Sequence, residues 1–319
     1  MILRYDLGMT AIVTGCAGFI GSQLVQRLLM RGERVLGIDN FSTGRIEFVE
    51  RSLKNPLFEF QEIDLLKNQV IAKYFAGKEI VYHFAANADV RYGALHPTRD
   101  TQQNLLVTQN ILEAMRVSRV RKIVFSSSGS VYGESQIIPT PENAPIPLQT
   151  SLYGASKFAC EALIQAYCET FQMQSWIFRF VSILGPRYTH GHVIDFFSQL
   201  RKNPEYLTVL GNGLQRKSYL HVNDCLEAIF IATAKSNHKV NLFNLGLNDT
   251  CNVIDSVGWI CERLGVKPNI DYGIETKGWI GDNPLIHLSN AKISSLGWKP
   301  KYSIKQSIVD TVDYLVENE

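Results

Sequence analysis

The stretch TGCAGFIG, residues 14–21, joins a short apolar run that predicts a strand to a run with helical periodicity. Its glycines Gly15, Gly18 and Gly21 allow a tight turn, close approach of a phosphate to the backbone, and close packing of helix on strand. The helix that follows presents unpaired N–H groups and a positive dipole, which favour a pyrophosphate. The alternative is a glycine turn required only by packing. No GK[ST] follows, so a mononucleotide P-loop is disfavoured.

The same strand-then-helix pattern continues along the first half of the chain. Alternation of strands with amphipathic helices predicts right-handed crossovers and a parallel sheet covered on both faces, an α/β fold of the doubly wound Rossmann type. The predicted strands are 10–15, 34–39, 57–64, 79–86, 121–128 and 174–181, and the helical patterns run over 22–32, 104–117 and 156–171.

After Val181 this regularity loosens. Segment 182–217 reads as loops around one helix, whereas 218–247 again reads as helix and strand that rejoin the sheet. We therefore expect a dinucleotide-binding domain over 1–181 with 218–247. Segments 182–217 and 248–319 would form a smaller, interleaved C-terminal domain that binds the substrate.

Composition limits the classes of protein. With 319 residues, 45% hydrophobic, 19% charged and a net charge of +2, the chain fits an ordinary globular protein without a bias toward nucleic acid. Its six cysteines include no CxxC pair, and the N-terminal stretch lacks the apolar core of a signal peptide. No apolar run is long enough to span a bilayer. We expect a cytoplasmic protein without membrane or nucleic-acid partners.

Two acidic residues follow predicted strands. Asp39 ends the second strand 18 residues after Gly21, where a carboxylate can hydrogen-bond both hydroxyls of an adenosine ribose. A 2′-phosphate there would meet like charge, so NAD is favoured over NADP. Asp64, at the end of the third strand, is a candidate adenine contact; the alternative is a turn or cap residue.

The stretch SLYGASKFACEAL, residues 151–163, places Tyr153 and Lys157 on one face of a helix. A nearby ammonium would lower the pKa of the phenol and make it a better base. Spacing alone is weak evidence, because Tyr74 and Lys78 repeat it in a stretch that reads as surface. The hydroxyl of Ser128, however, follows the fifth strand at its carboxyl end, where it can converge with Tyr153 on one substrate oxygen.

The chain resembles the extended short-chain dehydrogenase/reductase family, in particular its NAD-dependent nucleotide-sugar epimerase branch. The resemblance spans almost the whole sequence, and the order and spacing of its motifs are highly specific. Those motifs are TGCAGFIG, IDNFSTG, HFAANADV, NLLVTQNILEA, FSSSGSVYG, YGASK, RFVSILGPR, GNGLQRKSYLHVNDC and LGWKP.

The resemblance implies roles for individual residues. Tyr153 would be the catalytic base, Ser128 would hydrogen-bond the sugar hydroxyl, and Lys157 would hold the nicotinamide ribose. Asn104 would be a structural or cofactor-side polar group. Further contacts with the cofactor are implied for Phe19, Ile20, Asn40, Ser42, Thr43, Gly44, Leu65, Phe84, Ala85, Ala86 and Ser126.

The implied reaction is epimerisation at C4 of a nucleotide sugar through a transient 4-keto intermediate, with UDP-glucose and UDP-galactose as the favoured pair. Alternatives are a UDP-N-acetylhexosamine or UDP-uronate epimerase, a dehydratase or reductase of the same fold, an alcohol dehydrogenase with net redox turnover, or an idle NAD-binding module. Dehydratases of this family carry Thr-Asp-Glu where this chain has Ser128-Gly129-Ser130, so dehydration is disfavoured.

The substrate-side motifs depart from the best-known epimerases. Ser182 stands where many relatives have an Asn that contacts the nucleotide sugar, and Lys277 stands where an Arg usually clamps the diphosphate. Lysine keeps the charge but loses the bidentate fork. Arg216 or Lys217 could supply a second phosphate contact, and the sequence leaves open which. These changes put the identity of the sugar in doubt.

Three further expectations complete the interpretation. His190 and His192 with Asp195 resemble metal-ligand spacing, but without further ligands we expect no metal site. His83 and His221 lie in or beside apolar segments and are expected to be structural. The resemblance implies a homodimer.

Overall fold

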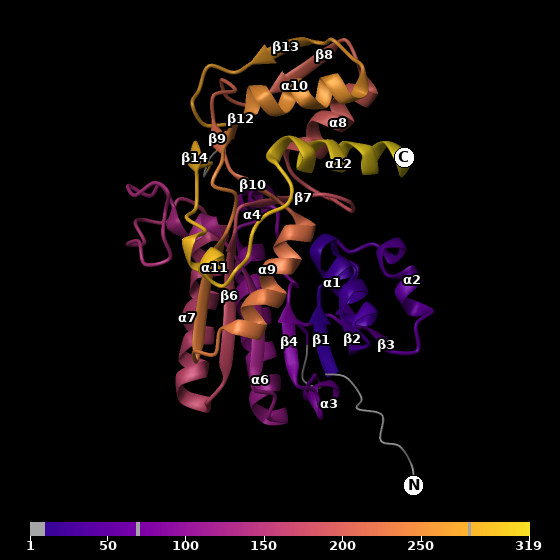
Figure 1. Ribbon diagram of the computed structural model, residues 1–319, viewed down its shortest axis with the longest axis vertical. Helices are drawn as coiled ribbons and strands as arrows, with labels where there is room; N and C mark the ends of the chain where they lie inside the picture. The colour runs from indigo at the N-terminus through magenta and orange to yellow at the C-terminus, as the bar shows by residue number, and fades with distance from the viewer. Residues whose placement is uncertain (1–9, 68–70, 280–281) are drawn as a thin grey trace.

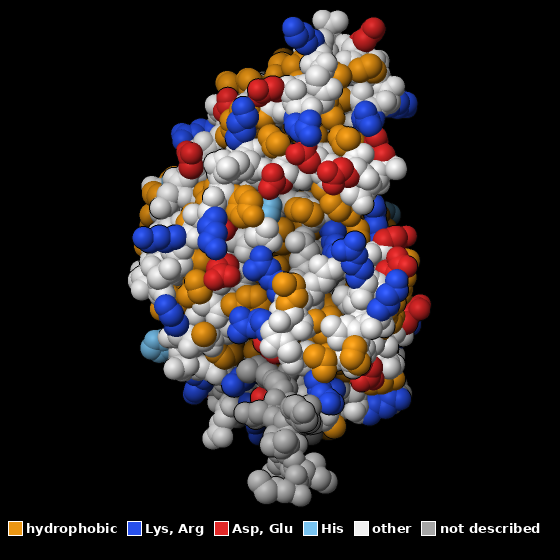
Figure 2. Space-filling model, turned by 45° about the vertical axis from the view of Figure 1, so that its right-hand side comes forward, with side chains coloured by type: hydrophobic (Ala, Val, Ile, Leu, Met, Phe, Trp, Pro, Cys, Tyr) orange, Lys and Arg blue, Asp and Glu red, His pale blue; other side chains and the backbone are white. Residues whose placement is uncertain are grey.

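A computed structural model describes residues 10–67, 71–279 and 282–319. Residues 1–9, where the sequence predicts no signal peptide, lie outside the described residues. Within the described part, no helix has the length and apolar character needed to cross a bilayer. Basic and acidic side chains are interspersed over the face seen in Figure 2, in keeping with a net charge near zero.

Seven parallel strands form the central sheet in the order β11-β6-β5-β4-β1-β2-β3. The predicted doubly wound parallel sheet is therefore confirmed, and strand β11 lies beside β6, so the chain returns to the sheet after leaving it. The strands are β1 (Thr10–Thr14), β2 (Arg34–Asp39), β3 (Phe58–Glu62), β4 (Ile80–His83), β5 (Lys122–Ser128), β6 (Gln174–Phe180) and β11 (Val240–Leu245).

Helices cover both faces of this sheet (Figure 1). Apolar side chains of α1 (Phe19–Met30) and α9 (Val222–Lys235) pack on one face. Those of α3 (Ala72–Phe75), α6 (Val107–Ser118) and α7 (Leu152–Phe171) pack on the other. Short helices α2 (Glu50–Leu53), α4 (Val90–Leu95) and α5 (Thr98–Asp100) lie in the connections.

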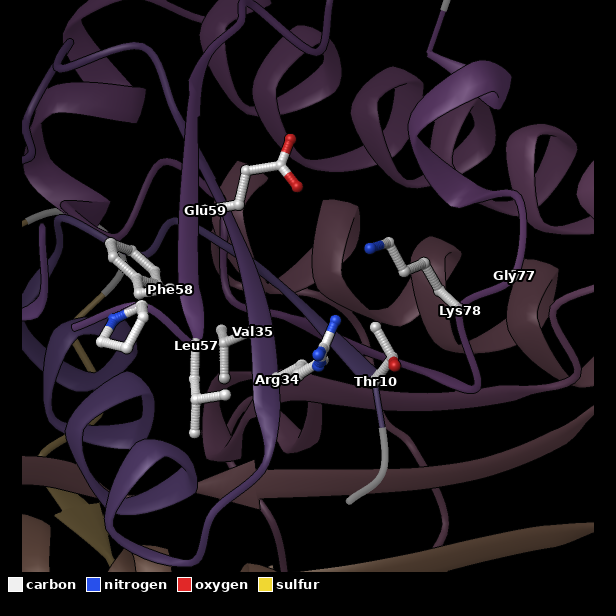
Figure 3. A pocket seen from close by; sticks show the side chains of 9 residues that line it. Thr10, Arg34, Val35, Leu57, Phe58, Glu59, Gly77 and Lys78 are labelled. Atoms are coloured by element: carbon white, nitrogen blue, oxygen red, sulfur yellow. The ribbon is translucent and has the colours of Figure 1, made fainter. Parts of the chain in front are cut away.

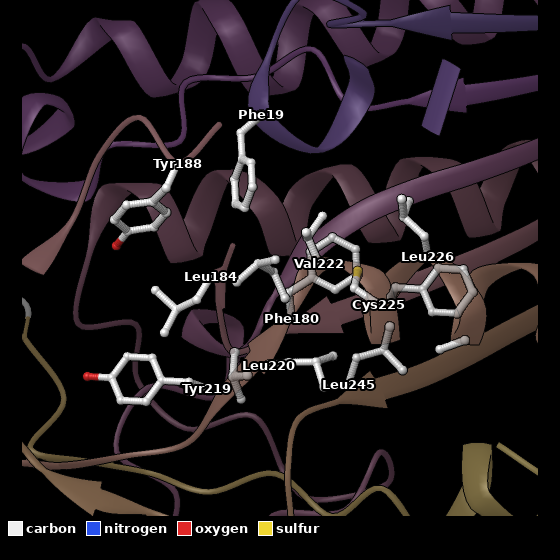
Figure 4. Packing of buried hydrophobic residues seen from close by; sticks show 14 of the residues in the cluster. Phe19, Phe180, Leu184, Tyr188, Tyr219, Leu220, Val222, Cys225, Leu226 and Leu245 are labelled. Carbon is white, nitrogen blue, oxygen red and sulfur yellow. The ribbon is translucent and has the colours of Figure 1, made fainter. Parts of the chain in front are cut away.

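The remaining segments build a smaller part above the carboxyl ends of the strands (Figure 1). Its core is continuous with that of the sheet: Phe19 of α1 meets Tyr188 edge-on at 5.8 Å between ring centroids, and the same cluster includes Leu184, Tyr219 and Leu220 (Figure 4). The elements are β7 (Ser182–Leu184), α8 (His192–Lys202), β8 (Tyr206–Val209), β9 (Arg216–Lys217), β10 (Tyr219–His221), β12 (Cys251–Asn252), α10 (Val253–Leu264), β13 (Asn269–Tyr272), β14 (Leu285–Ile286) and α12 (Ile304–Glu317). Helix α11 (Ala291–Ser295) lies lower, against β11 of the sheet, where Lys292 sits over the ring of Phe243 (Figure 1).

The helix predicted over 104–117 is irregular at its start. Residues Thr101–Leu106 form a π-helix, and regular α6 begins only at Val107. The wider turn contains Asn104, whose amide is buried and fully engaged with neighbouring segments. Periodicity over this stretch predicts a helix but cannot reveal a π-turn, which is often associated with functional sites.

Helix α7 begins at a defined point because Ser151 caps it. The Ser151 hydroxyl accepts a hydrogen bond from the Gly154 N–H at 3.0 Å. This cap places Tyr153 in the first turn and Lys157 one turn later, next to the end of β5.

The turn of residues 14–21 tolerates no side chain at Gly21. A Cβ there would lie 2.1 Å from the Gly15 carbonyl oxygen, which is backbone and cannot swing away. Gly21→Ala should therefore lower the free energy of unfolding, measured by urea denaturation, by at least about 1–3 kcal/mol.

The control is Gly258→Ala. Gly258 lies in α10, and a Cβ on it would meet open space. That change should be neutral or stabilising by up to about 1 kcal/mol; equal effects of the two would contradict the prediction.

Candidate active site

A cavity of about 560 Å³ opens at the carboxyl ends of the parallel strands. Ligands of open α/β sheets bind at this edge. Of the residues predicted to contact the cofactor, all but Asn104 line this cavity. They are Gly15, Gly18, Phe19, Ile20, Gly21, Asp39, Asn40, Ser42, Thr43, Gly44, Asp64, Leu65, Phe84, Ala85, Ala86, Ser126, Tyr153 and Lys157.

The glycine turn forms the floor of the cavity. Gly15 has φ +69°, and a Cβ on it would lie 2.7 Å from the Ala85 nitrogen, so only glycine fits between the turn and the segment after β4. Helix α1 begins after Gly18 without a side-chain cap and with no acidic residue in its first turn. Its first N–H groups therefore remain available to an anion such as a pyrophosphate.

Asp39 combines a structural contact with a free binding edge. One carboxylate oxygen accepts a hydrogen bond from the Ala17 N–H and the other from the Phe41 N–H, both at 2.9 Å. A carboxylate has about four acceptor positions, so lone pairs remain for the two hydroxyls of a ribose. Burial raises the pKa of Asp39, although these N–H groups counteract the effect. The cavity and this carboxylate fit an adenosine dinucleotide without a 2′-phosphate.

Asp64 has the turn role that the sequence left as an alternative. Its carboxylate accepts a hydrogen bond from the Leu66 N–H at 3.0 Å and pairs with Lys67 at 3.5 Å, while the residue also lines the cavity. Both interpretations of Asp64 are therefore compatible with its place.

Ser128 and Tyr153 converge at the junction of β5 and α7. The Ser128 hydroxyl accepts a hydrogen bond from the Ser130 N–H at 3.1 Å. It also donates to the Ser130 hydroxyl at 3.1 Å. Burial raises the pKa of the Tyr153 phenol, and the neighbouring Ser128 hydroxyl partly offsets this. The pair can act on one substrate oxygen.

Lys157 is a buried ammonium directed at the strand. Its side chain is 2% exposed, and Nζ donates to the Ser126 carbonyl at 2.9 Å. Nζ lies 5.9 Å from the Tyr153 ring centroid and 4.9 Å from that of Phe125. Burial lowers the pKa of Lys157 to about 8. The expectation that Lys157 lowers the pKa of the phenol was wrong for the protein alone, because burial of Tyr153 dominates and the ammonium points to Ser126.

Asn104 supports this junction from behind. It is 1% exposed; its amide oxygen accepts from the Asn87 N–H at 2.9 Å, and its amide nitrogen donates to Ser156 at 2.8 Å. The Ser156 hydroxyl in turn donates to the Tyr153 carbonyl at 2.8 Å. Of the two roles left open for Asn104, the structural one therefore agrees with its contacts.

The cationic residues expected at the substrate already have partners. Lys277 pairs with Glu134 on the surface, and Arg216 donates to Thr250 at 2.9 Å. Lys217 is largely buried and pairs with Asp282 at 2.6 Å. These three residues, together with Ser182, do not line the cavity, and Ser182 lies exposed at the start of β7.

Several lining residues were missed by the sequence interpretation. Segment 87–107, after β4, contributes Asn87, Asp89, Tyr92, Arg99, Gln103 and Val107, and Thr189 and His190 line the cavity as well. Because β4 ends at this edge, the rule that the carboxyl ends of parallel strands carry the ligand could have indicated the first group. No local pattern marks the second group.

The histidines have different surroundings. His190 lines the cavity, whereas the His192 Nε2 bonds the Ser256 hydroxyl at 2.8 Å and Asp195 pairs with Arg91 at 2.9 Å. In the described part of the chain, no group of three or more His, Cys, Asp or Glu side chains converges as a metal site would require.

His83 and His221 are structural, as predicted. The buried ring of His83 bonds Thr14 at 2.8 Å and Thr108 at 3.0 Å. His221 accepts from the Asn223 N–H at the start of α9, and its ring stacks on Tyr302 at 3.9 Å.

A second pocket, of about 230 Å³, lies at the opposite end of the sheet (Figure 3). Thr10, Arg34 and Phe58, at the amino ends of three strands, line it together with Lys78. The Tyr74 and Lys78 pair, which repeats the spacing of Tyr153 and Lys157, is thus remote from the glycine turn.

The comparisons agree with this geometry. The sequence matches the profile of the NAD dependent epimerase/dehydratase family over residues 11–246. It is 30% identical over 312 residues to the UDP-glucose 4-epimerase of Mycolicibacterium smegmatis, covering 96% of this chain and 98% of the relative.

Two solved structures extend the comparison. A UDP-galactose 4-epimerase superposes with a TM-score of 0.86 at 36% identity, covering 97% of this chain and 99% of the other. The UDP-glucuronic acid 4-epimerase of Bacillus cereus, solved with UDP-glucuronic acid and NAD, gives a TM-score of 0.89 at 26% identity and covers 98% of this chain and 100% of the other.

The buried ammonium of Lys157 makes stability depend on pH. Between pH 8 and its ordinary pKa of 10.5, the unfolded chain binds more protons on this group than the folded protein does. The free energy of unfolding should therefore rise over this range, by up to about 3 kcal/mol from Lys157. Urea denaturation at several pH values should show this rise in the wild type and a smaller one in Lys157→Met. Identical pH profiles for the two proteins would contradict the burial of a charged lysine.

Proposed function

The chain belongs to the NAD dependent epimerase/dehydratase family, and we propose that it interconverts the C4 epimers of a nucleotide sugar, with UDP-glucose and UDP-galactose as its substrate pair. The observation that carries the proposal is the convergence of Ser128 with Tyr153 and Lys157, the latter two of which line the dinucleotide cavity. The first relatives compared are 4-epimerases of UDP-sugars, which favours this reaction and this nucleotide.

Different residues of the cavity would bind different parts of the cofactor. We propose that the N–H groups at the start of α1 bind the pyrophosphate and that Asp39 binds the adenosine ribose. Lys157 would bind the nicotinamide ribose while keeping its bond to the Ser126 carbonyl. When bound, NAD supplies an acceptor and later a donor of hydride, together with a positive ring that favours the phenolate.

Tyr153 is the proposed base. In the protein alone burial keeps the phenol protonated, so proton acceptance depends on positive charge beside it, from Lys157 and the oxidised cofactor. The phenolate would take the proton of the sugar 4-hydroxyl, with Ser128 hydrogen-bonded to the same oxygen. Loss of this proton, together with loss of the C4 hydride, would leave a 4-keto sugar that turns over within the site. Hydride would then return to the opposite face of C4 and Tyr153 would return the proton to O4, without net oxidation.

The surroundings of Ser128 disfavour elimination of water. A Cβ on Gly129 would lie 3.2 Å from Leu288 Cδ1 and 3.3 Å from the Phe180 carbonyl, so a carboxylic side chain has little room there. The hydroxyl of Ser130 is already bonded to Ser128. Dehydration needs an additional acid and base near C5 and C6, and these positions supply none.

The substrate contacts are proposed on the smaller part of the molecule. Of the two neighbours on β9, Lys217 faces the interior and Arg216 faces outward, so Lys217 is the better candidate for the diphosphate. Ser182 and Lys277 remain predicted contacts to the nucleotide sugar. Segments 182–217 and 248–319 would thus form the substrate-binding domain, and 1–181 with 218–247 the NAD-binding domain.

Incubation with UDP-sugars tests the proposed function. With no added reductant, UDP-galactose should be converted to UDP-glucose, and back, without accumulation of NADH. Product analysis by NMR should include UDP-N-acetylglucosamine and UDP-glucuronic acid. Conversion of only one of these two would move the substrate assignment to that sugar, and stoichiometric NADH release would indicate a dehydrogenase instead.

Tyr153→Phe separates catalysis from binding. Removing the hydroxyl should lower kcat by at least about 100-fold, the scale of general acid–base catalysis, while NAD affinity measured by calorimetry stays close to that of the wild type. Tyr74→Phe is the matched control, because Tyr74 precedes a lysine at the same spacing but lies far from the cavity. It should keep full activity; retained activity in Tyr153→Phe would remove Tyr153 as the base.

A further inference from the structure

A buried ion pair lies directly behind the proposed catalytic residues. We infer that Glu161, held by Arg179 and bonded to Ser127, is a positioning residue that fixes helix α7 on strand β5 so that Tyr153 and Lys157 meet Ser128. The inference rests on the proposed function, because it assigns the ion pair to the same reaction.

The ion pair is fully enclosed. The side chains of Glu161 and Arg179 are 0% and 4% exposed, so neither can touch a ligand. Arg179 binds the carboxylate with two hydrogen bonds, from Nε to Oε1 at 3.0 Å and from Nη2 to Oε2 at 2.7 Å. This two-point contact fixes the orientation of the carboxylate as well as its place.

The helix brings Glu161 into register with the catalytic pair. Tyr153, Lys157 and Glu161 are each four residues apart on α7 and share one helix face. Any rotation or slide of α7 that displaced Tyr153 would therefore also break the contacts of Glu161.

The strand side of the contact is equally direct. The hydroxyl of Ser127 donates to Glu161 Oε1 at 2.5 Å. Ser127 lies between Ser126, whose carbonyl binds Lys157, and Ser128, the proposed partner of the sugar hydroxyl. One carboxylate thus ties the helix that carries two catalytic groups to the strand that carries the third.

The network continues into the segment that follows Ser128. The guanidinium of Arg179 lies 4.5 Å from the ring centroid of Tyr132, and its Nη1 donates to the Glu142 carbonyl at 3.4 Å. Tyr132 in turn donates to Asn244 of β11 at 2.9 Å. The position of the turn Gly129–Tyr132, which shapes the sugar side of the site, is therefore set by the same ion pair.

Stability alone does not require this arrangement. Burying two charges costs desolvation that their attraction often only balances, and well-packed apolar residues of similar volume usually do as well. An ion pair with fixed geometry does, however, specify one register of the helix against the strand, whereas apolar contacts allow several. Ser128, Tyr153 and Lys157 can act together only in one such register.

Ser127→Ala tests the positioning role with a small change. It removes the bond between β5 and Glu161 and leaves the ion pair in place, although Ser127 also lines the cavity. We expect kcat for UDP-galactose to fall by about 10- to 100-fold, because small misplacement of reacting groups has effects up to this size. KM should stay within about twofold. NAD affinity should fall about fivefold, the equivalent of one weakened hydrogen bond at Lys157.

Ser175→Ala is the matched control. Ser175 is also a buried serine, on β6, but it lies opposite Ile123 rather than Ser127. It should keep wild-type kcat and NAD affinity. If Ser127→Ala also retains both, the positioning role is refuted.

The double variant Glu161→Leu with Arg179→Met separates positioning from folding. It should unfold within a few degrees of the wild type yet be as slow as Ser127→Ala; recovery of wild-type kcat would show that the ion pair serves stability only. A wild-type protein that converts none of the UDP-sugars would refute the proposed function, and the NAD affinities of the variants would then decide the inference by themselves.

Discussion

The hydrogen bond from the Lys157 ammonium to the Ser126 carbonyl is the contact on which the proposed site depends. A nearly fully buried ammonium needs a hydrogen-bond acceptor close by, and here it is the Ser126 carbonyl. This bond therefore fixes the distance between helix α7 and strand β5. This contact also brings Tyr153 close to Ser128, because Tyr153 precedes Lys157 by one helical turn and Ser128 follows Ser126 by two residues. The network of Glu161, Arg179 and Ser127 maintains the same register from behind.

The sheet supplies the second half of the arrangement. Strands β1 and β4 are neighbours in the sheet, so the glycine turn after β1 and the segment after β4 lie side by side at its carboxyl edge. Gly15 and Ala85 are in contact there and leave no space for a side chain on Gly15. The cavity between them connects Asp39 at one end with Tyr153 and Lys157 at the other. A dinucleotide bound along it would bring its reactive ring to the junction of β5 and α7.

Much of this was predictable from the sequence because it is set by local patterns. Apolar runs placed the strands of the sheet to within a few residues, and the rule for carboxyl ends placed Ser128 and Asp39. What could not be predicted depends on packing between distant segments. The π-turn at Asn104 follows from buried contacts with residues 87 and 156, and the raised pKa of Tyr153 follows from burial. The choice between Arg216 and Lys217 depends on which side of a two-residue strand faces the interior.

A crystal structure with NAD and a UDP-sugar bound tests the central claim most directly. We expect the pyrophosphate at the start of α1, the adenosine ribose at Asp39, and the sugar 4-hydroxyl within hydrogen-bonding distance of both Tyr153 and Ser128. A sugar whose C4 lies away from Tyr153, or a dinucleotide bound outside the glycine turn, would contradict it.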